Sequence, residues 1–256
     1  MVSPVLLPSG TCTLYRGALA LNDMGVSLLE RGAYRAALDT LKDAIFVMKR
    51  VFPSSHHLHP GSYDIDAKLS RAYSKLASSK LEKPCSFNVE IVPHNVEFEA
   101  LRSVLLRTST PCNRQVNFVI KIEVFDAEDQ CVDVHSAILL HNFAVAHLSM
   151  SSLANSSSFV QRIRDGAFQL SSFARQTLGH LMQVDGPDTL EYLLQCNPCL
   201  ILVTAAVLHC QIQILEESGG EQWRAVKSYQ NLVLLSEIAQ NFDKPQLCNS
   251  RNAAAA

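Results

Sequence analysis

The chain has 256 residues, of which 48% are hydrophobic and 18% are charged, and its formal net charge is −2. This composition can support a sizeable core, and it excludes an intrinsically disordered chain or a collagen-like one. A pI near 6.5 provides no basic field for nucleic acid or for an anionic membrane surface, so we expect neither as a partner.

The N-terminus, the longest apolar run and the cysteines indicate the cellular compartment of the protein. No Lys or Arg precedes the short apolar stretch of the N-terminus, and two prolines interrupt it, so no signal peptide is predicted. The longest apolar run, 200–208, is too short for a transmembrane segment and predicts a buried helix. The eight cysteines then indicate reduced thiols. The predicted location is intracellular, in the cytoplasm.

Residues 18–50 contain two apolar stripes with the period of a helix. Gly32 lies between the stripes and can take the left-handed conformation that ends a helix. Two amphipathic helices with so short a connection must be antiparallel, which predicts an αα-hairpin. The small residues Gly25, Ala37 and Ala44 would let the two helix backbones approach closely.

This run resembles one tetratricopeptide repeat, a helix–turn–helix unit of about 34 residues. The positions that match in the family's order and spacing are Gly25, Gly32, Tyr34, Ala37 and Ala44. Leu21 stands where the family has a Trp, and Lys49 stands where it has a closing Pro. The resemblance implies a stack of hairpins whose first helices line a concave surface that holds a peptide or a partner helix.

Two further helix pairs are predicted at 134–180 and 188–242. Ala144 stands in the second pair where Gly25 stands in the first, and Ala167 and Ala174 repeat the seven-residue spacing of Ala37 and Ala44. The third pair matches the family mainly as a helix, a glycine turn and a helix.

The segment between the first two pairs has a different pattern. A loop, a helix at 65–82 and a short helix near 97–106 accompany two runs of alternating apolar residues, at 87–91 and 116–124. The alternation predicts two strands, whose pairing could be parallel or antiparallel.

The predicted fold class is therefore mainly α, a stack of antiparallel αα-hairpins with a small two-strand β insertion at about 51–133. A single domain would cover 18–245, between a flexible N-terminus at 1–17 and a disordered tail at 246–256.

The pair Cys196 and Cys199 is the strongest candidate for chemistry. A metal site would need two more ligands at a compatible spacing, and no second CxxC exists in the sequence. Pro198 favours a helix start here, which could activate a thiol. We interpret both cysteines as structural and keep a thiol-reactive or metal-binding protein as the alternative function.

The remaining motifs do not indicate catalysis. His56, His57 and His59 lie in a Pro- and Ser-containing loop and are interpreted as solvated rather than as metal ligands. His209 and Cys210 are adjacent on a helix, so their side chains diverge. The sequence has no G-x-S-x-G and no phosphate-binding loop, and the acidic run 123–133 lacks the spacing of a calcium loop. We expect no metal, no cofactor and no enzymatic activity.

The leading functional hypothesis is a non-catalytic adaptor or scaffold that binds another protein or a peptide. By resemblance, the residues that contact the partner would be Asn22, Val26, Leu29, His141, Asn142, Val145 and Leu148. No helix-borne pair of basic residues accompanies the two asparagines, which argues against recognition of a C-terminal carboxylate. The alternative is that the insertion itself fills the groove.

Overall fold

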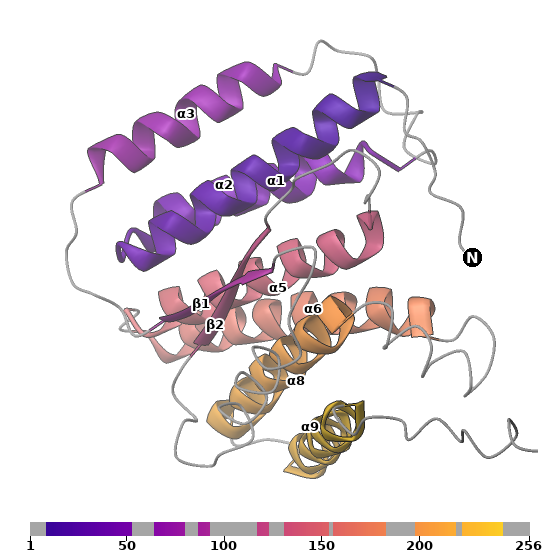
Figure 1. Cartoon of the computed structure of the whole chain (residues 1–256). Helices are drawn as coiled ribbons and strands as arrows, with labels where there is room; N and C mark the ends of the chain where they lie inside the picture. The colour runs from indigo at the N-terminus through magenta and orange to yellow at the C-terminus, as the bar shows by residue number, and fades with distance from the viewer. Residues whose placement is uncertain are drawn as a thin grey trace, which may run out of the picture.

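The computed structural model describes residues 9–52, 64–79, 87–92, 117–122, 131–153, 156–182, 198–218 and 222–242. These residues are mainly helical, as predicted. Figure 1 shows the helices in successive layers, with two strands in the middle of the molecule.

The first helix pair consists of α1 (Ser9–Glu30) and α2 (Tyr34–Lys49), which pack on each other. The prediction of a flexible N-terminus at 1–17 is wrong for residues 9–17, because α1 includes them. Tyr15 is only 2% exposed and packs in the main hydrophobic cluster, so this part of the helix is fixed by the core. Residues 1–8 lie outside the described part.

A glycine turn joins the two helices. Gly32 has a φ of 77°, a conformation that glycine adopts without strain. The Ala33 N–H donates to the Leu28 carbonyl and the Gly32 N–H donates to the Leu29 carbonyl, both at 2.9 Å. These two bonds form a Schellman motif, which ends α1 and reverses the chain.

The two helices of this pair lie close together at Gly25. A Cβ atom built on Gly25 would lie 2.6 Å from Leu41 Cγ, so a larger side chain would collide with α2. The other small positions that matched the repeat pattern are all fully buried: Ala37, Ala44, Ala144, Ala167 and Ala174.

Helix α3 (Ile65–Ser78) lies beside α1 and α2, and it ends four residues before the predicted boundary. The Asp64 carboxylate caps its N-terminus by accepting from the Ala67 N–H at 2.8 Å. At its other end, Arg31 donates to the Leu76 carbonyl at 2.7 Å. The loop residues 53–63 and the helix predicted near 97–106 lie outside the described residues.

The strands β1 (Phe87–Val92) and β2 (Asn117–Ile122) pair in parallel along their whole length. A parallel pair requires a long crossover, which the intervening residues are numerous enough to supply. Strand β2 packs against α1, α5 (Val132–Ser151) and α8 (Pro198–Ser218). Its residues Phe118, Val119, Ile120 and Ile122 are buried, so the strand belongs to the core.

The later helices pack on one another in chain order: α2 on α5, α5 on α6, α6 on α8 and α8 on α9. Their bounds are Val132–Ser151 for α5, Ser157–Met182 for α6, Pro198–Ser218 for α8 and Gln222–Phe242 for α9. The third predicted pair is thus described from Pro198 onward, and the tail predicted at 246–256 lies outside the described part.

Helix α8 is unusually apolar. Within the described residues, Cys199–Ser218 is the one helix long and apolar enough to cross a membrane, and 72% of its most apolar window is buried inside the protein. It packs against α5, α6, α9 and β2. A helix that is buried on most of its sides in a protein core is apolar all round, which accounts for the composition of α8.

Candidate functional site

The sides of α1, α5 and α8 that turn toward the strands form one surface, which we call the first-helix face. Strand β2 contacts all three helices and lies on this face (Figure 1). The face therefore holds an extended segment, and that segment belongs to the chain itself.

Two asparagines bind the middle of β2 through its backbone. Asn142 accepts from the Ile120 N–H at 2.9 Å and donates to the Ile120 carbonyl at 2.7 Å. Asn22 donates to the same carbonyl at 3.2 Å and accepts from Asn142 Nδ2 at 2.8 Å. Both amides are fully buried, so these bonds are shielded from water.

Two more side chains extend this contact along the strand. His141 Nε2 lies 2.9 Å from the Phe118 carbonyl, and the Asp23 carboxylate accepts from the Ile122 N–H at 3.1 Å. The groups bound are those of residues 118, 120 and 122, which point to one edge of the strand. Side chains of α1 and α5 thus take the place of a third strand.

Apolar side chains complete the face. Val119 of β2 lies in one hydrophobic cluster with the four predicted apolar contacts, Val26, Leu29, Val145 and Leu148. All seven residues that the repeat resemblance assigned to partner contact are buried. In this structure they are therefore not accessible to a partner, and Asn22, His141 and Asn142 bind β2 instead.

Asp23 is the one residue of the set that the sequence analysis did not identify. Burial raises the pKa of its carboxyl, and the Ile122 N–H bond works in the opposite direction. The sequence signal for Asp23 was its position next to Asn22, but the side chains of adjacent residues in a helix normally point about 100° apart.

The histidines at this face are kept neutral. Burial lowers the pKa of His141 to about 4, against a smaller opposite effect of its bond to Phe118, and it lowers the pKa of His209 to about 4 as well. Since Nε2 of His141 donates, its Nδ1 is left buried and without a hydrogen-bond partner among the described residues. His209 packs edge-on against the Phe118 ring at 5.2 Å.

The structure gives no support to a reactive thiol at Cys199. Burial raises the pKa of Cys199 to about 12, so this thiol is protonated at neutral pH. Cys210, beside His209, is buried and its pKa is likewise raised to about 12. Cys196 lies outside the described residues.

The metal candidates of the sequence analysis are not in the described part, since His56, His57 and His59 lie outside it. Among the described residues, no group of three or more His, Cys, Asp or Glu side chains is placed to hold a metal ion.

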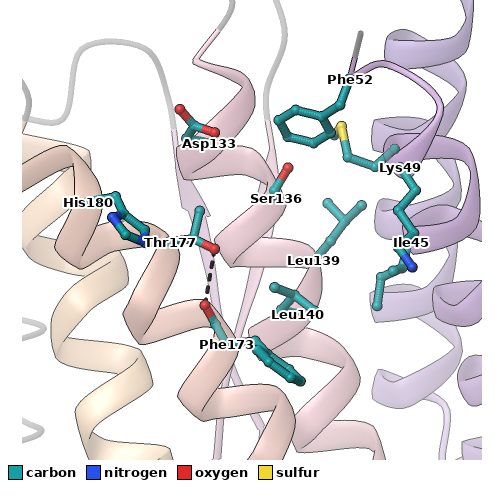
Figure 2. Close-up of a pocket in the computed structure, with 11 residues that line it drawn as sticks. Ile45, Lys49, Phe52, Asp133, Ser136, Leu139, Leu140, Phe173, Thr177 and His180 are labelled. Atoms are coloured by element: carbon teal, nitrogen blue, oxygen red, sulfur yellow. Dashed lines mark hydrogen bonds between the residues drawn. The ribbon is translucent and has the colours of Figure 1, made fainter. Parts of the chain in front are cut away.

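A pocket of about 610 Å³ opens on the opposite side of the helices, between α2, α5 and α6 (Figure 2). Its walls are largely apolar and include Leu139, Leu140 and Phe173. The hydroxyls of Ser136 and Thr177 line it, but each donates to a carbonyl of its own helix, at 2.7 and 3.0 Å. Lys49, Asp133 and His180 also line the pocket, so it combines largely apolar walls with a few charged or polar side chains.

No family model, curated protein or solved structure matches this chain.

Proposed function

We propose that this protein is a non-catalytic interaction scaffold, built as a tetratricopeptide-like stack of αα-hairpins with a two-strand insertion. Its partner binds outside the first-helix face, at the end of the stack formed by α9. The support comes from the energy that holds β2 in place and from the apolar residues that α9 exposes.

Displacement of β2 by a competing peptide would be costly. Burial of each large apolar side chain stabilises by about 1.5–3 kcal/mol, so the four buried side chains of β2 contribute about 6–12 kcal/mol. A peptide that binds with a micromolar Kd has about 8 kcal/mol of binding free energy, which lies within this range and gives it no advantage over the strand. It would also compete with a strand tethered in the same chain. The first-helix face is therefore part of the core.

The observation that carries the proposal is the outward side of α9. Trp223, Val226 and Leu234 lie on one side of this helix and are 62%, 55% and 56% exposed. We call these three residues the α9 face. Exposed apolar patches of this kind commonly mark sites of protein interaction.

The position of the α9 face in the helix order strengthens this reading. The second helix of each earlier pair, α2 or α6, packs against the first helix of the next pair. Helix α9 is the last described helix, and no described helix follows it. The ends of repeat stacks need a polar cap, and α9 instead presents apolar residues that a partner can cover.

A photo-crosslinking amino acid at position 226 tests this function, with the same group at Tyr73 as the control. Tyr73 is 69% exposed on α3, distant in the helix order from α9. We expect a discrete adduct from position 226 in an extract of the native cell, and none from position 73.

The adduct should disappear when Leu234→Lys is added, because the α9 face is then interrupted by a charge. Leu234 is exposed, so the variant should keep the melting temperature of the wild type. Equal adducts from positions 226 and 73, or an adduct that survives Leu234→Lys, would contradict the proposal.

A further inference from the structure

The two sides of α9 have opposite properties. Its inward side carries the buried residues Ala225, Ser228, Leu232 and Leu235, and the two leucines belong to the main hydrophobic cluster. Helix α9 packs on α8 and lies outermost in the stack (Figure 1). The opposite side, which includes the α9 face, is exposed to solvent and can be covered by another molecule.

The exposed side of α9 reads the same in both directions. Its exposed residues occur at successive spacings of three, four, four and three: Trp223, Val226, Gln230, Leu234 and Glu237. At about 100° per residue, these positions fall within about 80° of the helix circumference. The pattern is symmetric about Gln230, so an antiparallel copy of α9 would present the same positions at the same heights.

In that antiparallel arrangement, the apolar residues of the two copies would meet. Val226 would lie opposite Leu234 of the second copy, and Leu234 opposite Val226 of the second copy. A contact of this kind uses the same patch on both molecules, which is the geometry of a closed two-fold dimer.

The charges of α9 favour the same arrangement. Lys227 is exposed in the first half of the helix, and Glu237 is exposed in the second half. In the antiparallel pair, Lys227 would lie four residues in height, about 6 Å, from Glu237 of the second copy, which its long side chain can span. The indole N–H of Trp223 could donate to the same carboxylate.

A parallel pair of α9 helices would have the opposite electrostatics. Lys227 would lie beside Lys227 of the second copy, and Glu237 beside Glu237 of the second copy. Like charges placed side by side disfavour an arrangement, and opposite charges fix the orientation of paired helices. The charge pattern therefore selects the antiparallel copy.

We infer that the α9 face binds the α9 face of a second copy of this chain, antiparallel and two-fold symmetric about Gln230. The inference rests on the proposed function, because it names the occupant of the same face. Five residues from each copy are few beside the roughly 20–30 of a standard interface, so we expect a Kd in the micromolar range.

Sedimentation of the purified full-length protein, from about 1 to about 300 μM, measures this association. The wild type should pass from monomer to dimer within this range. Lys227→Glu puts a carboxylate at both charged positions, and Glu237→Lys puts an ammonium group at both. Each variant should weaken the dimer by about tenfold, at about two- to fivefold for each of the two symmetric contacts.

An equimolar mixture of Lys227→Glu and Glu237→Lys tests the geometry most sharply. In the mixed dimer each carboxylate would again meet an ammonium group, so the mixture should associate about as tightly as the wild type. The double variant Lys227→Glu/Glu237→Lys should also recover, because it restores opposite charges at both contacts. The control is Lys42→Glu on an exposed position of α2, which should dimerise as the wild type does.

A wild type that stays monomeric, single variants that dimerise as tightly as the wild type, or a mixture no tighter than its components would overturn the inference. Crosslinking from position 226 separates the two proposals. If the purified protein stays monomeric and position 226 still gives its discrete adduct in the extract, the scaffold function stands and the second copy is the wrong occupant. Absence of an adduct from position 226 in both preparations would overturn the function itself.

Discussion

The first-helix face and the groove of about 330 Å³ between α6, α8 and α9 share helix α8 but differ in how their polar groups are arranged. On the face, the polar groups are buried and bonded to the backbone of β2, and its histidines are held neutral. In the groove, Arg224 and Lys227 are exposed beside the exposed Trp223, whereas Gln211 and Ser228 are buried. The difference indicates that the face maintains the fold, whereas the groove presents charged side chains next to the exposed α9 face.

The largest effect on stability is expected from Asn142→Leu, which replaces the amide side chain beneath β2 with an apolar side chain of similar size. The Ile120 N–H and the side-chain oxygen Oδ1 of Asn22 would each lose a hydrogen bond to Asn142 in a buried site. A buried polar group without a partner costs about 1–3 kcal/mol, so we expect a loss of about 4 kcal/mol in the free energy of unfolding.

Urea denaturation measures this loss, with Gln176→Leu on the exposed side of α6 as the control for a similar change of chemistry. If the two variants were equally stable, the amide contacts would not hold β2 and the comparison between face and groove would fail.

Acid should act on the face through His141 and His209. Their pKa values are about 4 in the folded protein, against about 6.5 in an unfolded chain, so unfolding takes up protons below pH 6.5. Above pH 7 these two histidines should make no pH-dependent contribution to the free energy of unfolding. It should fall between pH 6.5 and pH 4, by roughly 3 kcal/mol for His141.

Urea midpoints measured across this pH range check the dependence. His141→Gln keeps a donor for the Phe118 carbonyl and removes the titration, so its midpoint should change less with pH. An identical slope in the wild type and in His141→Gln would show that His141 is not the group that titrates.

Two glycines give a matched test of helix contacts. Gly25→Ala would place a methyl group against Leu41 and should destabilise the protein by about 1–3 kcal/mol. Gly179→Ala on α6 meets no atom within 4 Å, so it should stabilise by about 0.5–1 kcal/mol through helix propensity. Thermal denaturation would reveal opposite shifts, and a stabilising Gly25→Ala would contradict the packing of α1 on α2.

The smallest effect is expected at the margin of the face, where Lys121 of β2 pairs with Glu30 at 2.6 Å. Both side chains are partly exposed, so Lys121→Gln should cost less than about 1 kcal/mol. A thermal shift as large as that of Asn142→Leu would mean that charge, and not the buried amides, fixes β2.

The sequence predicted the local structure well where a residue or a pattern is compatible with few backbone conformations. Gly32 ends α1 in the expected conformation, and the alternation of Phe118, Ile120 and Ile122 coincides with a strand. The early start of α1 at Ser9 was missed, because a short segment with two prolines before it resembles a frayed terminus.

The occupant of the first-helix face could not be predicted in the same way. An amide such as Asn142 binds the backbone of any extended segment, so its position on a helix is compatible with a partner peptide or with β2. The pattern also could not locate the groove, since Arg175 and Lys227 lie far apart in the sequence and line one groove only because α6 and α9 both pack on α8.

The central claim, that β2 is part of the core and not a displaceable ligand, is tested most directly by native-state hydrogen exchange at Ile120 and Ile122. We predict that both amides exchange only through global unfolding, because they donate to the buried Asn142 and to Asp23. Exchange of these amides by a local opening, well below the free energy of global unfolding, would contradict the account and return the first-helix face to the list of open binding sites.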